Sequence, residues 1–385
     1  MRIGFLFNHD QVHQIPHSLP IAMELAKSGE HEVVAITSSP RLTAQVRALG
    51  GDLVGSKIEL VELGIKPWSR AKSLLVSPIA PAAKLFFYRD NLDYLRGFDA
   101  LVVTEKTSLV LKTQFELTKP KLIHTRHGAG DRAIGFNSNS KMFDHVLASG
   151  PKIRNRLIQD LDMPESQISV IGYPKFDLFK SPSVIPQING NPVAVYNPHP
   201  APHLSSWYKD GNRIIDGLVS KGAHTFFAPH IMMFERRYAI SLESKSIRRP
   251  PPVASRFRTN TAVTIDTSGP ALSDMSYMML ADAYIGDASS QVYEFLKIPR
   301  PCVFINSERH DWEGNPDFAH WRAGVVIDDA ARIGDALDEA ISSHDGTYRP
   351  IQERMFADTF DLTDTPSSVR GAQAIVEFLA RDRAG

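Results

Sequence analysis

The sequence has a single cysteine, Cys302, among its 385 residues. One cysteine excludes an intramolecular disulfide framework and a zinc site built from several cysteines. Long apolar runs are also missing, since none approaches the about 20 residues that cross a bilayer. The first residues, Met1–Asp10, do not have the pattern of a secretory signal peptide. These absences predict a cytoplasmic protein of a reducing compartment.

Charge of one sign is not in excess. Lys plus Arg number 43 and Asp plus Glu number 43, so no overall field favours nucleic acid as a partner. No nucleic-acid-binding motif accompanies the local basic stretches either. Hydrophobic residues make up 43% and charged residues 22%, which is typical of a globular protein. At roughly 100–200 residues per domain, the length predicts two or three domains.

Short apolar runs alternate with helical patterns along the first half. Several runs are continuous in Val, Ile, Leu and Phe, which predicts parallel strands that are buried on both faces. The alternation predicts βαβ units and a doubly wound α/β sheet. The expected strands are Arg2–Asn8, Glu32–Thr37, Ile58–Leu63, Ala100–Thr104, Leu122–Thr125, Val146–Ala148 and Ser169–Gly172, and the expected helices include Leu19–Ser28, Arg41–Leu49, Ser108–Leu117 and Lys152–Leu161.

A polar stretch with several Pro and Gly residues, 181–192, predicts a linker, after which the pattern restarts. We therefore expect two Rossmann-like domains, residues 1–180 and 193–366, facing each other across a cleft in the GT-B arrangement of glycosyltransferases. Residues 367–385 are expected to form a C-terminal helix that packs back on the first domain. The elements expected in the second domain are the strands Val193–Tyr196, Thr225–Phe227, Ala262–Asp266, Ala283–Ile285 and Val303–Asn306 and the helix Ser206–Val219.

Several cofactor and catalytic motifs are absent. The loop after the first expected strand, Asn8–Gln14, is polar and free of glycine, so a nicotinamide or flavin dinucleotide site is not expected there. The sequence has no P-loop, G-x-S-x-G or H-E-x-x-H, and we expect no cofactor. His9, His13 and His17 are spaced by four, as are His199 and His203, but Pro16, Pro200 and Pro202 interrupt both helical patterns, so no metal site is expected.

The strongest chemical signal lies where the strand Leu122–Thr125 ends. His127 follows this strand, and ligands of open α/β sheets bind at the carboxyl ends of the strands. A neutral imidazole there can take a proton from an attacking hydroxyl, because its pKa lies near neutrality. Gly128 and Gly130 allow the backbone to approach a phosphate. A loop histidine held only by structural hydrogen bonds is the alternative.

Two further signals follow strand ends in the second half. A helix is expected to begin at about Ser290, in Asp287-Ala288-Ser289-Ser290, and the unpaired N–H groups of a helix start bind anions. A nucleotide diphosphate is the expected ligand, with Glu294 one turn on to accept hydrogen bonds from ribose hydroxyls. Ordinary capping by the serines is the alternative. The third signal is His230, which ends the strand Thr225–Phe227 and so parallels His127.

Two segments are rich in basic residues, Lys66–Arg96, which also holds aromatic residues, and Arg236–Arg258. Basic and aromatic residues together suit an anionic lipid surface, and a solvated loop or helix face is an equally good interpretation. Peripheral contact with the inner face of the cytoplasmic membrane is therefore left open.

Over roughly Leu122–Asp329 the sequence resembles the CDP-glycerol glycerophosphotransferase family of teichoic-acid polymerases and primases. It departs from the family pattern at Ala228, His199 and Ala288, where the family usually has a basic residue, Thr and Tyr. The elements that match in order and approximate spacing are His127-Gly128…Arg132…Gly135, Gly172-Tyr173-Pro174-Lys175-Phe176-Asp177, Tyr196-Asn197-Pro198, the strand-end His230 and Asp287-Ala288-Ser289-Ser290.

The resemblance implies a GT-B fold and metal-independent transfer from a CDP- or UDP-linked donor, with His127 as the general base and His230 as a ligand of the donor phosphates. We expect the enzyme to move a polyol-phosphate or sugar unit to a glycan or lipid-linked acceptor of the cell envelope. The alternatives are a UDP-sugar glycosyltransferase, a UDP-sugar 2-epimerase of the same fold and a non-catalytic nucleotide-sugar-binding scaffold. The residues expected to bind the donor are Gly128, Arg132, Pro198, His199, Asp287, Ser289, Ser290 and Glu294.

Overall fold

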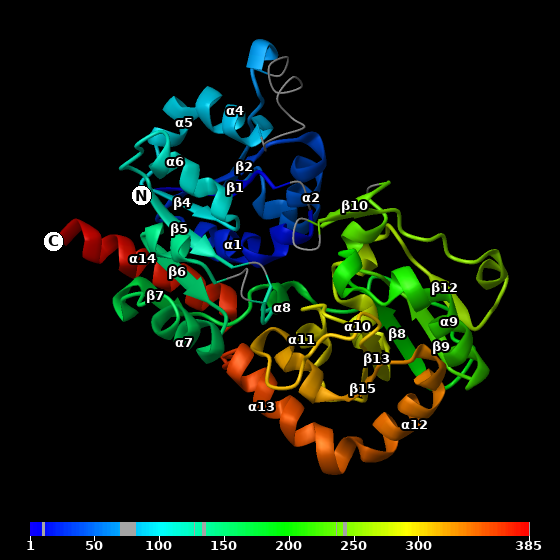
Figure 1. Ribbon diagram of the computed structural model, residues 1–385. Helices are drawn as coiled ribbons and strands as arrows, with labels where there is room; N and C mark the ends of the chain where they lie inside the picture. The colour runs from blue at the N-terminus through cyan, green and yellow to red at the C-terminus, as the bar shows by residue number, and fades with distance from the viewer. Residues whose placement is uncertain are drawn as a thin grey trace. The chain divides into compact units, whose positions relative to one another are not determined.

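The computed structural model describes residues 1–9, 12–69, 82–126, 128–132, 136–235, 237–241 and 245–384. The chain divides into two compact units (Figure 1). Unit 1 comprises residues 1–129, 136–178 and 358–385, and unit 2 comprises residues 130–135 and 179–357. Each unit has its own parallel sheet, which confirms the predicted α/β fold with two doubly wound sheets.

The described part of unit 1 contains a seven-stranded parallel sheet in the order β3-β2-β1-β4-β5-β6-β7. The order reverses between β1 and β4, the arrangement of a Rossmann sheet. All seven strands were predicted from the alternation of short apolar runs with helical patterns. They are β1 (Arg2–Phe7), β2 (Glu32–Thr37), β3 (Ile58–Glu62), β4 (Ala100–Val103), β5 (Lys121–Thr125), β6 (His145–Ala148) and β7 (Ile168–Val170).

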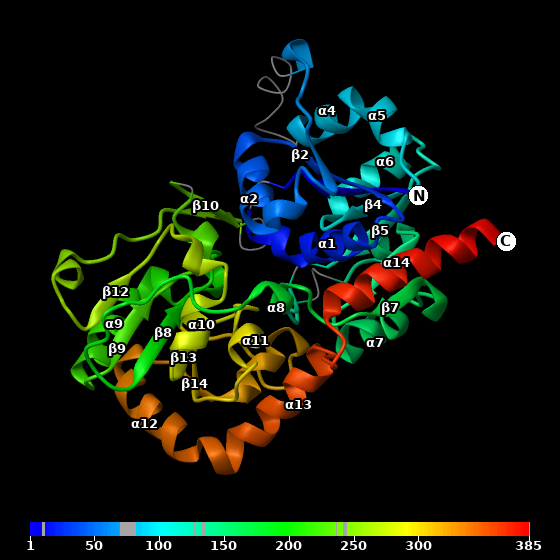
Figure 2. The same cartoon turned by 180° about the vertical axis from the view of Figure 1, so that it is seen from behind.

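Helices cover both faces of this sheet, because alternate side chains of each strand point to opposite faces. Ile3 and Phe5 of β1 pack against α1, α2 and α14, whereas Leu6 packs with α4, α5 and α7. Helices α1 and α14 lie side by side (Figures 1 and 2). The helices of unit 1 are α1 (Leu19–Ser28), α2 (Pro40–Gly50), α4 (Ala82–Asp90), α5 (Leu92–Arg96), α6 (Val110–Thr113), α7 (Pro151–Gln159), α8 (Lys175–Leu178) and α14 (Ser367–Ala384).

Unit 2 repeats the same topology. Its described residues form a six-stranded parallel sheet in the order β12-β9-β8-β13-β14-β15 and a two-stranded antiparallel hairpin, β10-β11. The sheet order reverses between β8 and β13. The strands are β8 (Val193–Asn197), β9 (His224–Phe227), β10 (Ala239–Ser241), β11 (Ser246–Arg248), β12 (Val263–Ile265), β13 (Ala283–Gly286), β14 (Cys302–Ile305) and β15 (Val325–Ile327), and the helices are α9 (Trp207–Ser220), α10 (Ser276–Leu280), α11 (Val292–Phe295), α12 (Ile333–Ser343) and α13 (Arg349–Thr359).

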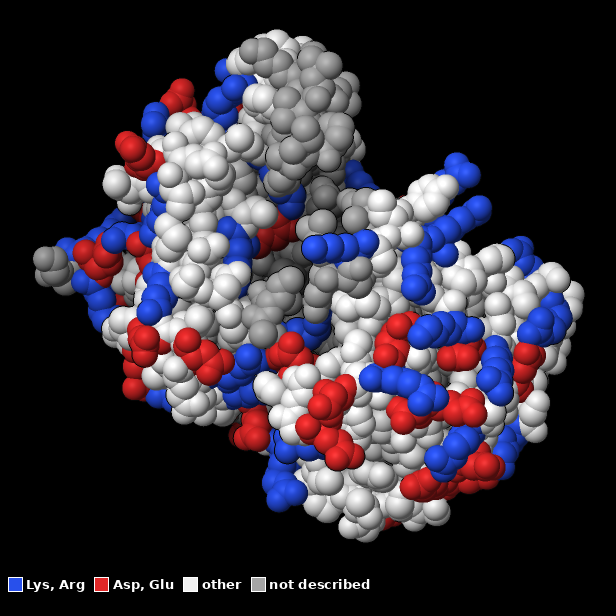
Figure 3. Space-filling view, viewed as in Figure 1, with Lys and Arg blue, Asp and Glu red and all other residues white. Residues whose placement is uncertain are grey.

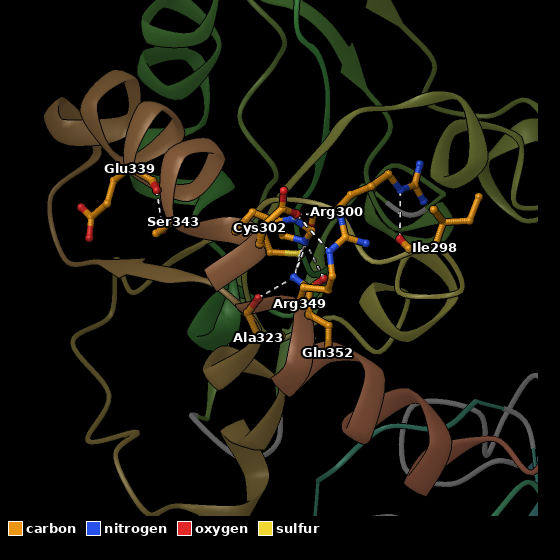
Figure 4. Close-up of polar contacts among 10 residues, drawn as sticks. Ile298, Arg300, Cys302, Ala323, Glu339, Ser343, Arg349 and Gln352 are labelled. Carbon is orange, nitrogen blue, oxygen red and sulfur yellow. Dashed lines mark hydrogen bonds and ion pairs between the residues drawn. The ribbon is translucent and has the colours of Figure 1, made fainter. Parts of the chain in front are cut away.

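A buried glutamine fastens α13 to the segments that precede β14 and β15. Gln352 is completely buried. Its Nε2 donates to the carbonyl oxygens of Arg300 at 2.9 Å and Ala323 at 2.8 Å (Figure 4). Because these carbonyls lie beside the amino ends of β14 and β15, the opposite edge of the sheet is left to the loops that carry the predicted site.

Two further observations concern the charged surface and the apolar character of the helices. On the face seen in Figure 3, basic and acidic side chains are interspersed over both units. Within the described ranges, no helix is both long and apolar enough to cross a membrane. Residues 70–81, 236 and 242–244 of the two basic segments lie outside the described residues.

Candidate functional site

The predicted donor residues of unit 2 meet where its strand order reverses. His199 follows β8, Asp287 follows β13, and β8 pairs with both β13 and β9. His230 follows β9 on the other side of β8. Ligands of open α/β sheets bind at this reversal, outside the carboxyl ends of the strands. These loops therefore form the candidate site.

Asp287 holds the loop after β8 in place. Its carboxylate accepts hydrogen bonds from the backbone N–H of His199 at 2.7 Å and from the N–H and hydroxyl of Ser206 at 2.8 and 2.9 Å. The residue is 1% exposed, and burial raises the pKa of its carboxyl to about 7 against these hydrogen bonds, which lower it. Asp287 is placed to position the site rather than to contact a ligand.

Backbone hydrogen bonds fix the tautomers of the two histidines. The N–H of Ala201 donates to Nδ1 of His199 at 3.0 Å, and the N–H of Met232 donates to Nδ1 of His230 at 3.3 Å. A neutral imidazole whose Nδ1 accepts carries its proton on Nε2. The two rings lie 6.3 Å apart between centroids, so the arrangement provides two Nε2–H donors side by side.

A guanidinium, that of Arg132, lies near this pair. Burial lowers the pKa of His199 well below its usual value, and the neighbouring His230, Arg132 and His203 lower it further. His199 is therefore neutral at physiological pH. A neutral N–H donor next to a guanidinium suits the oxygens of a phosphate group.

A cavity of about 340 Å³ opens beside the histidines. His199, His230 and the carboxylate of Glu235 form its polar wall, whereas two methionines and a tyrosine give it an apolar side. The wall also includes the loop that follows Pro198, a buried residue whose carbonyl accepts the N–H of His230 at 3.1 Å. The lining residues are His199, Pro200, Ala201, His230, Met232, Met233, Glu235, Tyr238 and Ala239.

The two serines after β13 differ in access. Ser289 is 1% exposed, and its hydroxyl accepts the N–H of Gln291 at 3.4 Å, whereas Ser290 is exposed. The backbone of Gly130 comes so close that a Cβ there would lie 3.2 Å from the Cβ of Ser290. Of the pair, Ser290 is the residue a ligand can reach.

The helix after these serines corrects one expectation. It was predicted to begin at about Ser290, but α11 begins at Val292 and ends at Phe295. A helix of one turn has a small dipole, so the anion site cannot depend on a helix start here. Glu294, on α11, is 4% exposed.

Sequence reasoning missed a buried group that holds Arg132 near this site. Asp131 accepts hydrogen bonds from the Tyr293 hydroxyl, at 2.8 Å to each oxygen, and from Nδ1 of His320 at 2.9 Å. Nε2 of His320 also contacts the carbonyl oxygen of Asp287 at 3.2 Å. Asp131 and His320 are 189 residues apart, so no local pattern signals their contact.

Asn197, also unpredicted, joins three of the loops. Its amide donates to the carbonyl oxygen of Ala228 at 2.7 Å and to the side chain of Gln291 at 3.0 Å. The ends of β8, β9 and β13 are thereby held in register. Asn197 lies inside the Tyr196-Asn197-Pro198 element, which was singled out only for its resemblance.

The remaining predicted residues belong to unit 1 or lie outside the description. His127 lies outside the described residues. Gly128, in unit 1, has φ +83°, a conformation that favours glycine. No group of three or more His, Cys, Asp or Glu side chains in the described ranges is arranged to hold a metal ion.

The chain is similar to known proteins in structure but not in sequence. No protein-family model and no curated protein sequence matches the chain. Solved structures do match over nearly its whole length. The wall teichoic acid polymerase TagF is 13% identical, with a TM-score of 0.59, and the match covers 99% of this chain and 89% of that chain.

Two other kinds of enzyme share the architecture. UDP-GlcNAc 2-epimerase from Neisseria meningitidis, bound to UDP-GlcNAc, is 13% identical with a TM-score of 0.62, covering 99% of this chain and 100% of that one. The calicheamicin glycosyltransferase CalG4 is 14% identical with a TM-score of 0.55, covering 99% of both chains. The fold is the predicted GT-B fold. At these identities the likeness establishes the fold alone.

Proposed function

We propose that the chain is a transferase that binds a nucleotide-diphosphate donor in unit 2 and moves a polyol-phosphate or sugar unit to a glycan or lipid-linked acceptor of the cell envelope. One observation carries the proposal, the pair of Nε2–H donors of His199 and His230 beside Arg132. A lipid-linked acceptor would bring the protein to the inner face of the cytoplasmic membrane. The fold shared with a teichoic acid polymerase supports the same class of reaction.

The proposed reaction is a displacement at the donor. For a polyol phosphate, the acceptor oxygen bonds to the β-phosphorus and the nucleoside monophosphate leaves. For a sugar, the oxygen bonds to the anomeric carbon and the nucleoside diphosphate leaves. Negative charge builds on the leaving phosphate, and prearranged donors stabilise it most where water is excluded. His199, His230, Arg132 and Ser290 are proposed for that role, without a metal.

A separate group must take the proton of the acceptor hydroxyl. His199 and His230 are poorly suited, because each accepts a backbone N–H at Nδ1 and carries its proton on Nε2. His127 remains the proposed general base. Pro198, Asp287, Ser289 and Glu294 complete the proposed donor site in unit 2. Among these, Asp287 and Ser289 act from buried positions by holding its loops.

Nucleotide binding tests the proposal directly. We expect CDP, UDP or GDP to raise the thermal stability of the full chain, since a ligand at 100 times its dissociation constant stabilises by about 2.7 kcal/mol. His230→Ala should weaken that binding about 10- to 100-fold in calorimetry, because a hydrogen bond to a charged group contributes roughly 1.5–3 kcal/mol. Ser290→Ala should weaken it by a similar factor or less.

A matched control lies on the same strand. His224 begins β9, at the opposite end from His230, and is completely buried. His224→Gln should lower stability but leave nucleotide affinity unchanged. Absence of binding by every nucleotide diphosphate, or binding that His230→Ala leaves intact, would contradict the proposal. Conversion of UDP-GlcNAc without any acceptor would favour the epimerase alternative.

A further inference from the structure

Three basic side chains of unit 1 meet around one aromatic ring. The guanidinium carbons of Arg126 and Arg156 lie 4.3 and 3.8 Å from the ring centroid of Phe136. Next to the ring, Nζ of Lys106 donates to Oδ1 of Asn137 at 3.0 Å. We call Lys106, Arg126 and Arg156 the Phe136 cation cluster.

The cluster lies at the ligand-binding edge of its sheet. Lys106 follows β4 and Arg126 follows β5, so both lie beyond the carboxyl ends of adjacent parallel strands. Arg156 reaches the same place from α7. The strand β4 borders the reversal of strand order in unit 1, where open α/β sheets bind their ligands. The cluster has no part in the donor site of unit 2.

Three basic side chains lie close together here, and one of them, Arg156, is paired with the exposed carboxylate of Asp160. Burial lowers the pKa of Lys106 to about 8, and the charge of Arg126 contributes to that shift. Burial likewise lowers the pKa of Arg126 to about 10, with a contribution from Arg156. All three residues are half-buried, but Nε of Arg126 is fully buried, so a ligand from solvent would reach the cluster through Lys106 and Arg156. An anion bound among them would relieve the repulsion.

The geometry points to a phosphate site, and we infer that the Phe136 cation cluster binds a phosphate group of the acceptor. Donors arrive from three separate segments, which suits a tetrahedral anion with oxygens in several directions better than a planar carboxylate. Guanidinium groups also bind phosphate through two parallel hydrogen bonds. The assignment of this phosphate to the acceptor rests on the proposed transferase function.

The aromatic ring prepares the site before a ligand arrives. Phe136 holds both guanidinium groups against its ring by cation–π interaction. Arg156 is further held by its hydrogen bond from Nε to Asp160 at 3.0 Å. Side chains fixed in advance lose less entropy on binding. The inferred acceptor is thus a phosphorylated polyol, or a lipid or glycan that carries a phosphate.

Binding of sn-glycerol 3-phosphate tests the site, followed by ³¹P line broadening with the full chain. We expect Arg156→Gln and Lys106→Gln each to weaken binding about 10-fold or more, because each removes a charged donor to the phosphate. Arg154→Gln is the matched control, since both arginines lie on α7 and pair with a carboxylate, Arg154 with Glu165 and Arg156 with Asp160, whereas Arg156 lies against the Phe136 ring. It should bind as the wild type does, and every variant should keep its thermal stability within a few degrees.

A second arm identifies the source of the phosphate. Sedimentation with phosphatidylcholine vesicles, with and without phosphatidic acid, would show whether a lipid phosphate binds in place of the soluble one. If Arg156→Gln weakens binding of either glycerol 3-phosphate or the phosphatidic acid vesicles, the result supports the site. No binding by the wild type, or equal losses in Arg156→Gln and Arg154→Gln, would overturn it.

Failure of the inferred phosphate site can be distinguished from failure of the proposed donor site. In His230→Ala, glycerol 3-phosphate binding should persist, and in Arg156→Gln, binding of nucleotide diphosphates should be unchanged. Loss of glycerol 3-phosphate binding in His230→Ala alone would mean that unit 2 binds the phosphate, which contradicts the inference and leaves the donor site standing. Failure of every nucleotide to bind would instead remove the transferase function, while an Arg156-dependent phosphate site would remain.

Discussion

At the scale of single residues, the histidines of this chain do different work because their surroundings differ. His199 and His230 have Nδ1 occupied by a backbone N–H, and both are proposed to donate from Nε2 to the donor phosphates. His145, in contrast, is completely buried in β6, where its Nε2 contacts the hydroxyl of Ser169 at 2.9 Å and its ring stacks on Phe378. Such a ring is accommodated only while it is neutral.

This burial predicts a pH dependence of stability. Burial, with the charge of Arg381, lowers the pKa of His145 from 6.5 to about 4. As pH falls below 6.5 the unfolded chain takes up the proton first, so the free energy of unfolding falls until about pH 4 and the loss then levels off. The loss from this residue is about 3 kcal/mol. Urea unfolding of the wild type and His145→Gln between pH 7 and 4.5 measures it, and equal pH slopes in the two proteins would contradict it.

Polar residues at strand ends could be predicted from the sequence. The hydrogen-bond partners of buried polar residues could not. His230 and Asp287 could be found because each follows an apolar run that reads as a buried strand, whereas His199 was expected as a donor ligand only from the family resemblance. Asp131 could not, because its partners Tyr293 and His320 lie 162 and 189 residues away. Burial also separates Ser289 from Ser290, which are identical as sequence. Only the fold distinguishes the structural serine from the accessible one.

At the scale of elements, apolar runs predicted most of the strands correctly. Some short strands and helices were missed or were predicted with the wrong bounds. Strands buried on both faces need apolar side chains at every position, which leaves a clear pattern. The three-residue strand β15, Val325–Ile327, was not predicted, although all three of its residues are apolar. The helix expected over Ser108–Leu117 is reduced to α6, Val110–Thr113, after a 3₁₀ turn. Contacts with the rest of the fold determine the secondary structure of such short segments.

The Gly172–Asp177 segment, noted for its resemblance, fastens the start of α14. Asp177 accepts the N–H of Ser368 at 2.6 Å, and the N–H of Tyr173 donates to the Ser367 hydroxyl at 2.9 Å. Gly172 has φ +86°, and a Cβ there would lie 2.3 Å from Oγ of Ser367. This motif therefore has a structural role within unit 1.

Loss of that cap should loosen α14. Asp177→Ala should lower the free energy of unfolding by about 0.5–2 kcal/mol, as expected for a lost helix cap. Gly172→Ala should cost at least as much, because it combines strain with a steric clash. Hydrogen exchange of residues 367–384 together with chemical unfolding measures the effect. Asp93→Ala, at a side chain 97% exposed, is the control, and unaltered exchange in Asp177→Ala would refute the capping role.

At the scale of the whole molecule, the chain repeats one topology and divides its proposed chemistry between the copies. Both sheets reverse their strand order after the first strand of their unit, at β1–β4 and at β8–β13. Residues 130–135 belong to unit 2, although β5 and Gly128, which precede them, belong to unit 1. One loop thus runs from the proposed base, His127, to the proposed phosphate ligand Arg132. The sequence could show the loop, but only the fold assigns its two ends to different units.

This division leads to a kinetic prediction for His127. The acceptor hydroxyl is a poor nucleophile until a base takes its proton, and such assistance contributes about 10²–10⁴-fold in rate. His127→Ala should therefore lower turnover by about that factor. Its donor affinity should stay within about twofold of the wild type, because the proposed donor ligands His199, His230 and Ser290 all belong to unit 2. His230→Ala should lower donor affinity and turnover together.

Steady-state kinetics and calorimetry on the same preparations separate these effects. His31→Ala, a half-buried histidine of unit 1 that immediately precedes β2, serves as the control and should leave both quantities unchanged. Near-native turnover of His127→Ala would mean that another group takes the proton. His9 would then be the next candidate, since it follows β1 at the same edge of the unit 1 sheet and is only 1% exposed. Reduced donor affinity in His127→Ala would instead mean that the loop around His127 contributes to the donor site, and the proposed separation of base and donor ligands would be wrong.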